Sequence, residues 1–331
     1  MKILITGAHG DISCSVGKII KSTFKKFEIF GTDIENNGPG DYLFKKIFKT
    51  PSIFSKDYLK IIKKIYKKFD LIIPCTEPDI NYITKKKLNK IFPILINKPE
   101  IILKFNSKIK TLKFLKSHFK ILSTNFFYEK KNIQYPFFLK KNIGYGNKGY
   151  SLIENSGQLK KKINSKNWVG QEYLTGIDNE YTCSIIKLKN FEKVLILNRK
   201  LHKTGYTYFA SVEENKKLEN ILIDFVRKIK LHGCINIQLK IIKNQFKVFD
   251  INTRLSSTVM MRNIIGFKDC VWWIKDFFKI KFSKRIYIKK NISIFKDFSE
   301  RLISNKEQAS SNTKWNKSSS STNINVSIIF F

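Results

Sequence analysis

With 331 residues and 42% hydrophobic side chains, the chain has the size and composition of a globular protein with two or three modest domains. No apolar run approaches the roughly 20 residues of a membrane helix. The five cysteines form no CxxC pair, which argues against a zinc site and a disulfide framework. We therefore expect a cytoplasmic protein.

The net charge of +37 suggests a polyanion partner, but the basic residues are mostly of one kind. Only six of the 63 are arginine, the side chain that best forks onto bases and phosphates. Lysine is enriched together with isoleucine, asparagine and phenylalanine, all of which have A/T-rich codons. We expect genome composition to explain the charge, with no specific nucleic-acid partner. A polyanion or a membrane surface stays open as the alternative.

Residues 1–97 alternate short apolar runs with segments of helical spacing. Strands are expected over 2–6, 28–33, 70–74 and 92–96, and helices over 16–27, 56–68 and 79–90. Strands that alternate with helices predict a small parallel α/β domain.

A glycine turn follows the first of these strands. Gly7 and Gly10 can cradle a phosphate at a helix N-terminus, and Asp33 ends the second strand, where a ribose-binding acid would stand. The dinucleotide fingerprint wants a third glycine where the chain has Ser13. Two interpretations stay open: a nicotinamide site of an oxidoreductase or epimerase, or a turn that simply lets the α/β unit close tightly.

The pattern changes after residue 97. Helices are expected over 99–105, 108–117 and 216–231, with antiparallel strands within 124–190 and over 234–242 and 245–251. This predicts an α+β domain after residue 97. Residues 304–331 are rich in serine, asparagine and lysine, which predicts a disordered tail.

A lysine followed by glycines marks a candidate phosphate site. Lys140 ends an apolar strand, and the next residues supply Lys148 together with Gly144, Gly146 and Gly149. Three glycines in six residues free backbone N–H groups to wrap a polyphosphate, and the lysines can neutralise its charge. A flexible basic hairpin is the alternative.

Two strands near the end of this domain carry candidate metal ligands. Asp250 and Asn252 share one strand face because side chains repeat every second residue, and Gln238 lies on the preceding strand. Such oxygen ligands suit Mg²⁺ (or Mn²⁺) that bridges ATP phosphates. Arg254, just beyond, can stabilise charge on a transferring phosphoryl group. An exposed edge strand is the alternative.

Five local motifs, in order, resemble the ATP-grasp enzymes, especially those similar to the carbamoyl-phosphate synthase large chain. Residues 107–115 resemble D-K-x-x-T-x-x-F-L, and 139–149 resemble V-K-P with a G-x-G-S-x-G loop. Further matches are Q-E-Y-I-x-G-x-E at 171–180, N-x-Q at 236–238 and E-I-N-P-R at 250–254. The departures are Ser107 for an acid, Asp250 for Glu, Thr253 for Pro, and a longer gap before Glu180.

The resemblance implies a Rossmann-like pre-ATP-grasp domain at 1–97. It also implies an ATP-grasp domain at 98–290, with a small lid subdomain at about 120–175, whose two α+β subdomains clasp ATP. It implies nucleotide contacts from Lys108, Lys140 and the glycine loop. It places Glu172, Tyr173 and Leu174 at the adenine, Glu180 at the ribose, and Gln238, Asp250 and Asn252 on magnesium.

The function that follows is a carbon–nitrogen ligase for small molecules. ATP would phosphorylate a carboxylate to an acyl phosphate, and an amine, or less often a thiol, would then attack it. Lys140 and Arg254 would stabilise the charge with Mg²⁺. Arg199 would contact the carboxylate or acyl phosphate, or else be an ordinary surface arginine. A homodimer is allowed for.

Overall fold

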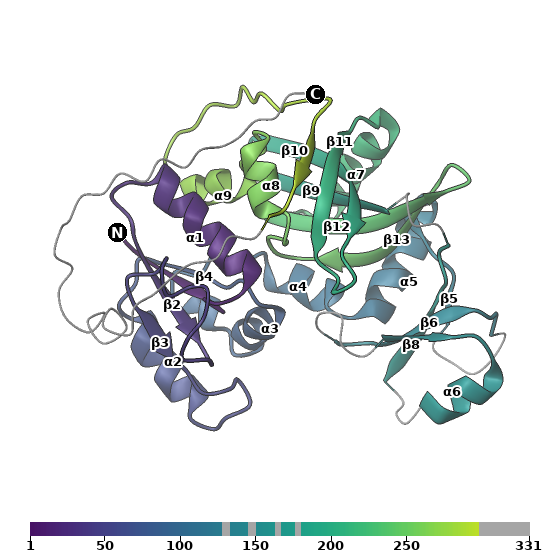
Figure 1. The fold of residues 1–331 in the computed structure, drawn as a ribbon, viewed down its shortest axis with the longest axis horizontal. Coiled ribbons are helices and arrows are strands. Elements are labelled where there is room, and N and C mark those ends of the chain that lie inside the picture. Colours follow the sequence, from purple (N-terminus) through teal and green to yellow (C-terminus); the bar gives the residue numbers. More distant parts are fainter. Residues whose placement is uncertain (128–132, 145–149, 163–166, 176–179, 298–331) are drawn as a thin grey trace. The chain divides into compact units, whose positions relative to one another are not determined.

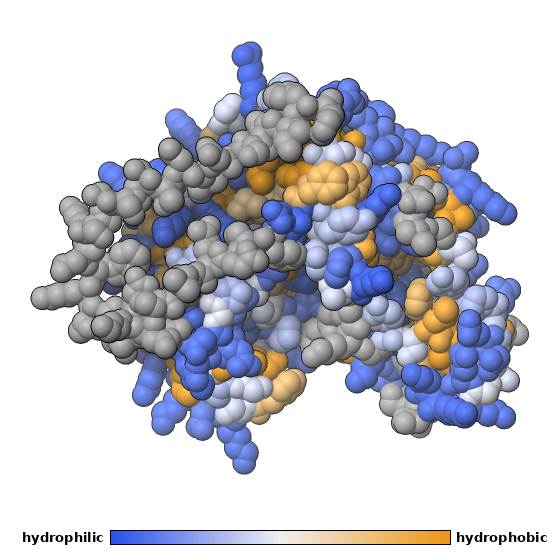
Figure 2. All heavy atoms as spheres, in the orientation of Figure 1, coloured by the Kyte–Doolittle hydropathy of each residue, from blue (hydrophilic) through white to orange (hydrophobic). Residues whose placement is uncertain are grey.

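The computed structural model describes residues 1–127, 133–144, 150–162, 167–175 and 180–297, which form three β-sheets and their covering helices (Figure 1). The tail expected at 304–331 and the loop residues Gly146, Lys148 and Gly149 lie outside these ranges. Within them, no helix is long and apolar enough to cross a bilayer. Hydrophilic side chains cover much of the described surface on the face shown in Figure 2.

The first sheet is parallel, with strand order β3-β2-β1-β4, as the α/β prediction required. Its central strand β1 is apolar on both faces because both are buried. The strands are β1 (Lys2–Thr6), β2 (Glu28–Asp33), β3 (Ile47–Lys49) and β4 (Leu71–Ile73), and the helices are α1 (Asp11–Thr23), α2 (Tyr58–Tyr66), α3 (Glu77–Lys85) and the 3₁₀ helix η1 (Leu88–Lys90).

Several expected boundaries in this part were wrong. Helix α1 starts at Asp11 rather than at residue 16, because the small residues Ser13 and Cys14 are buried and mask the apolar period. The helix expected over 79–90 is broken by Lys87, whose φ is 55°. The strand expected over 92–96 is reduced to one bridge between Ile72 and Ile94.

The first glycine turn closes on the protein itself. The Asp33 carboxylate accepts hydrogen bonds from the backbone N–H groups of His9 (2.9 Å) and Glu35 (3.1 Å). Gly7 has a φ of 63°, and a Cβ there would lie 2.4 Å from Cγ2 of Thr76. The structure therefore fits the tight-turn interpretation, and the nicotinamide interpretation has no support.

The remaining sheets are antiparallel. The smaller has the order β5-β8-β6-β7, and the larger has the order β13-β12-β9-β10-β11-β14. Their strands are β5 (Phe126–Phe127), β6 (Phe137–Lys141), β7 (Tyr150–Ile153), β8 (Trp168–Glu172), β9 (Glu180–Leu188), β10 (Phe191–Leu201), β11 (Thr207–Glu213), β12 (Gly233–Ile242), β13 (Gln245–Asn252) and β14 (Ser293–Phe295). The turn expected at Lys243 and Asn244 is confirmed, with φ values of 47° and 61°.

Helices cover both faces of the six-stranded sheet. The expected α4 (Pro99–Phe105), α5 (Lys108–His118) and α7 (Lys216–Lys228) are confirmed, whereas α6 (Ser156–Lys162), η2 (Lys120–Leu122), α8 (Val259–Ile264), α9 (Asp269–Phe277) and strands β3, β10, β11 and β14 were not predicted. Apolar side chains of α4, α5 and α7 pack on one face. On the other face α8 and α9 share a core with α1 of the parallel sheet.

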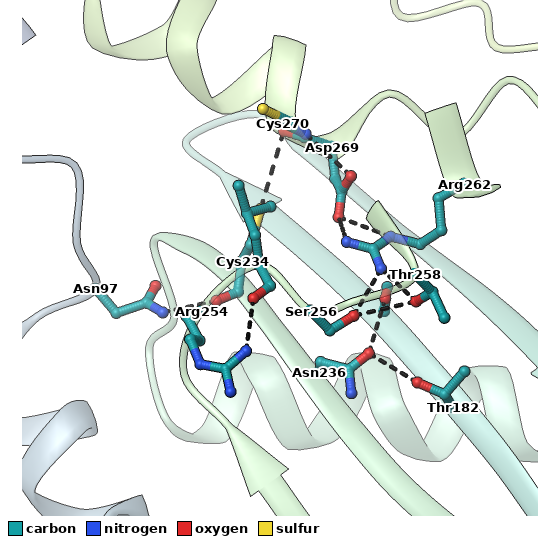
Figure 3. Close-up of polar contacts among 12 residues, drawn as sticks. Asn97, Thr182, Cys234, Asn236, Arg254, Ser256, Thr258, Arg262, Asp269 and Cys270 are labelled. Carbon is teal, nitrogen blue, oxygen red and sulfur yellow. Dashed lines mark hydrogen bonds and ion pairs between the residues drawn. The ribbon is translucent and has the colours of Figure 1, made fainter. Parts of the chain in front are cut away.

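One buried ion pair fixes the loop that follows β13 (Figure 3). Arg262 of α8 donates from Nη2 and Nε to Oδ2 of Asp269, at 2.7 and 3.1 Å, and both side chains are almost fully buried. Its Nη1 also donates to the hydroxyls of Ser256 (2.7 Å) and Thr258 (2.6 Å). Burial raises the pKa of Asp269, and Arg262 opposes that rise.

We predict that Arg262→Met lowers the free energy of unfolding by about 3–5 kcal/mol, because it leaves a buried carboxylate without its partner. Urea denaturation followed by tryptophan fluorescence measures the change. Without Arg262, the folded-state pKa of Asp269 rises further above its unfolded value. The loss should therefore shrink as the pH falls and Asp269 takes up a proton.

The exposed Arg227→Met is the matched control, and its stability should stay close to that of the unsubstituted protein. Arg262→Met combined with Asp269→Leu should recover most of the lost stability. An Arg262→Met protein as stable as the control at neutral pH would contradict the prediction.

Candidate functional site

A cavity of about 520 Å³ is lined by strands of both antiparallel sheets and by residues of helices α1, α3, α4 and α5. Its wall is built from α3, α5, β6, β8, β9, β10, β12, β13 and the loop after β13. Every candidate site residue within the described ranges lines it: Lys108, Lys140, Gly144, Glu172, Tyr173, Leu174, Glu180, Arg199, Gln238, Asp250, Asn252 and Arg254. Sequence motifs spread over some 150 residues therefore meet at one place.

Lys140 projects into the cavity from β6. Its Nζ donates to Oε1 of Gln171 on the neighbouring strand β8, at 2.7 Å, and lies over the rings of Phe138 and Phe249. Gln171 is fixed in turn, because its Nε2 donates to Thr124 Oγ1 at 2.6 Å. Burial lowers the pKa of Lys140 to about 8, although Asp250 opposes the shift.

Asp250 and Asn252 share one face of β13, as the alternation predicted. Nδ2 of Asn252 donates to Oδ2 of Asp250 at 2.7 Å, and Lys108 of α5 places its Nζ 3.6 Å from Oδ1 of Asp250. Gln238 stands directly opposite Asp250 on β12. Burial alone would raise the pKa of Asp250, but Lys108 and Lys140 outweigh it and hold this pKa below its usual value.

Arg199 is a buried hub rather than the surface side chain allowed for above. Only 6% of it is exposed. Its Nε and Nη2 donate to Oε1 of Glu180 at 3.0 and 2.7 Å, and Nη2 also donates to Oε1 of Gln238 at 2.9 Å. Arg199 on β10 thereby links β9 and β12 and fixes two other candidate residues in place.

Residues 172–174 form the edge of the cavity at the end of β8. Oε1 of Glu172 lies 3.4 Å from Nζ of Lys247, and the carbonyl of Leu174 accepts a hydrogen bond from Lys240 Nζ at 3.0 Å. These lysines sit on β13 and β12, so the segment is tied to the larger sheet. The sequence motif indicated the segment but not the lysines that hold it.

Arg254 faces the N-terminal part of the chain. Its Nη2 donates to Oε1 of Glu77 at 2.9 Å, and its Nη1 donates to the carbonyl of Leu255. Nearby, the Asn97 amide donates to the carbonyls of Cys234 (2.6 Å) and Thr253 (2.8 Å) (Figure 3). Sequence reasoning missed Glu77, because nothing in a single acid at a helix start distinguishes it from a surface residue.

Two family models match separate segments of the chain. Residues 3–91 match the PylC-like N-terminal domain, and residues 164–295 match the ATP-grasp domain described from a biosynthetic pathway with the Ter operon. The second match contains Glu180, Gln238, Asp250 and Asn252 in their expected order. The second match identifies an ATP-grasp domain in this chain.

Several solved structures have the same fold as this chain. It is similar to N5-carboxyaminoimidazole synthetase from Staphylococcus aureus complexed with ADP (TM-score 0.69, 18% identity, 87% of this chain and 79% of that one). It is also similar to L-amino acid ligase from Bacillus licheniformis (0.64, 13%, 83% and 74%). A third is the biotin carboxylase domain dimer of Hydrogenobacter thermophilus 2-oxoglutarate carboxylase with MgADP (0.68, 12%, 88% and 73%).

A curated relative is less informative about activity. The uncharacterized protein MG011 homolog of Mycoplasma pneumoniae is 30% identical over 155 residues, which is 46% of this chain. The aligned region spans about half, 52%, of that relative's length. The predicted Rossmann-like and ATP-grasp arrangement is thus confirmed, whereas the domain boundaries at 97, 98 and 290 stay predictions.

We predict that Lys140 titrates with a midpoint near pH 8. Competitive acylation followed by mass spectrometry of the Lys140 peptide measures the midpoint, because only the neutral amine reacts. Asp250→Asn removes the charge that favours the ammonium form and should move the midpoint to a still lower pH.

Asp224→Asn, an exposed change on α7, is the matched control and should leave the midpoint where it is. A Lys140 midpoint above pH 10, in the ordinary range for lysine, would contradict the prediction.

Proposed function

We propose that this ATP-grasp protein is an ATP- and Mg²⁺-dependent ligase that activates a carboxylate as an acyl phosphate and joins it to an amine. The observation that carries the proposal is the convergence of Lys108, Lys140 and Arg254 with the acidic residue Asp250 on one cavity. Cations grouped around the carboxylate of Asp250 suit a metal-bound polyphosphate.

The donor atoms on β12 and β13 fit a magnesium ion. Because Nδ2 of Asn252 is turned toward Asp250, the amide oxygen of Asn252 is left for a ligand. The described residues hold no cluster of three His, Cys, Asp or Glu side chains. The donor set is therefore one carboxylate and the amide oxygens of Asn252 and Gln238, and Oε1 of Gln238 would share its two lone pairs between the ion and Arg199 Nη2, which donates to it at 2.9 Å. Mg²⁺ bound with substrate phosphates needs only one or two carboxylates. When bound, it would neutralise charge on those phosphates.

The nucleotide would extend from this cluster toward β8. Lys108 and Lys140 would bind its phosphates, together with Gly144 and the loop residues beyond it. Residues 172–174 would contact the adenine at the cavity edge, and Glu180 would bind the ribose. Arg199 orients Glu180 through its two hydrogen bonds, so we assign it a positioning role in addition to any contact with substrate.

The reaction needs positioning and charge stabilisation from the chain. A carboxylate oxygen attacks the γ-phosphorus, the bond to the β-phosphate oxygen breaks, and ADP leaves. An acceptor that binds as an ammonium first gives one proton to solvent. The amine nitrogen then attacks the acyl carbon, the bond from that carbon to the phosphate oxygen breaks, inorganic phosphate leaves, and the nitrogen loses one further proton. Arg254 would stabilise charge on the transferring phosphoryl group. The thiol as an alternative acceptor, the homodimer and the cytoplasmic location stay predictions.

We predict that carboxylate-dependent ADP release, with an amine present, requires Asp250. Asp250→Asn should lower kcat/KM by about 100-fold or more, because the amide no longer offsets the lysines or attracts the metal. A coupled ADP assay across a panel of carboxylates and amines measures this.

Asp224→Asn serves as the control for the charge change and should keep full activity. ATP with Mg²⁺ should also raise the melting midpoint of the unsubstituted protein, whereas NAD(P) should not. Absence of any substrate-dependent ADP release across the panel would count against the ligase.

A further inference from the structure

Helix α3 presents two polar side chains to the cavity that the proposed nucleotide and metal sites do not use. Glu77 and Asn81 are four residues apart, so they lie on the same face of the helix. Both line the cavity from the N-terminal part of the chain. This wall would hold a second substrate beside the nucleotide.

Asn81 is the observation that points to a ligand. Only 5% of the residue is exposed, and its Oδ1 is buried without a hydrogen-bond partner. Buried polar groups in folded proteins almost always have partners, because leaving one unpaired costs free energy. A side-chain amide that lines a cavity and lacks a partner therefore indicates a hydrogen-bonding ligand.

Glu77 supplies charge to the same wall. Its Oε1 accepts the hydrogen bond from Arg254 Nη2, which leaves the rest of the carboxylate available to a second cation. The neighbouring acid on α3, Asp79, is different, because it accepts hydrogen bonds from Tyr58 and Thr76 and is buried. Glu77 is thus the carboxylate of α3 that faces the cavity.

The surroundings narrow the chemistry of the ligand. Ile80 lies on the same helix between Glu77 and Asn81, and Ile12 and Ile102 also line the cavity, so the polar pair is accompanied by apolar side chains. A carboxylate beside a partnerless amide oxygen accepts hydrogen bonds and attracts positive charge. The matching ligand group is an ammonium on a short aliphatic skeleton.

We propose that Glu77 and Asn81 form the subsite for the acceptor amine, which binds as a small aliphatic ammonium compound. This inference rests on the proposed ligase function. The 2.9 Å contact between Glu77 and Arg254 places the acceptor nitrogen next to the residue assigned to the transferring phosphoryl group. The subsite selects acceptors that are cations at neutral pH over those that are neutral.

The test has two arms with the full chain, Mg²⁺ and ATP. In the first, hydroxylamine traps acyl phosphates as hydroxamates across a panel of carboxylates and identifies the donor. In the second, that donor is combined with L-alanine, ethanolamine, n-propylamine or putrescine, and with aniline as an acceptor that is neutral at pH 7.5. ADP release gives KM for each acceptor.

We expect the ammonium compounds to be the better acceptors. Glu77→Gln should raise their KM by about tenfold or more, with a smaller effect on KM for ATP. Asn81→Leu should also raise it, whereas Asn81→Asp, which keeps an acceptor oxygen, should keep it near the original value or lower it. The exposed Glu100→Gln on the next helix is the matched control.

The outcomes separate the two proposals. If no carboxylate yields hydroxamate or ADP, the ligase function fails and the subsite with it. If hydroxamate forms but aniline is the preferred acceptor, or Asn81→Asp and Asn81→Leu change the acceptor KM alike, only the subsite fails. Melting midpoints of each variant with ATP and Mg²⁺ distinguish an altered subsite from a misfolded chain.

Discussion

The arrangement of this ATP-grasp protein depends on holding charges of both signs together in a partly dry cavity. Burial lowers the pKa of Lys140 to about 8, and Lys108 and Lys140 hold the pKa of Asp250 below its usual value although burial would raise it. Either sign alone would be unfavourable in this place. Helix α5, strands β6 and β13, and the hydrogen bond from Lys140 to Gln171 hold these opposing charges at their distances.

Much of the site was predictable because its residues sit in regular elements. Side chains alternate along any strand, so Asp250 and Asn252 share one face independently of the tertiary structure. Lys140 could be recognised because it ends an apolar run that predicts a strand. The hydrogen bonds of Arg199 were not predictable, because β10 and β11 were not recognised and register across three strands decides its partners. Glu77 and Asn81 were missed because only the folded chain brings helix α3 to a cavity whose strands are far from it in sequence.

The fold, like the candidate site, was predictable in its regular elements and not where tertiary contacts decide the structure. Elements with a strong apolar period, such as β1 and α7, were found near their true bounds. Errors fell where local chemistry outweighs the period: buried small residues at the start of α1, a left-handed Lys87 that breaks a helix, and a run containing Pro93 that pairs through one bridge. Such features depend on single side chains and their tertiary neighbours, which no local pattern records.

The core shared by α1, α8 and α9 limits how independently the two halves of the chain can change. The two family models match separate segments of the chain, which are called modules here. One apolar cluster nevertheless runs from β1 and α1 to the strands and helices of the second module. Asn97, in the connecting segment, also donates hydrogen bonds to the carbonyls of Cys234 and Thr253. Exchanging one module for that of a distant relative would expose two unmatched apolar surfaces. Change in either module is therefore constrained by its packing against the other.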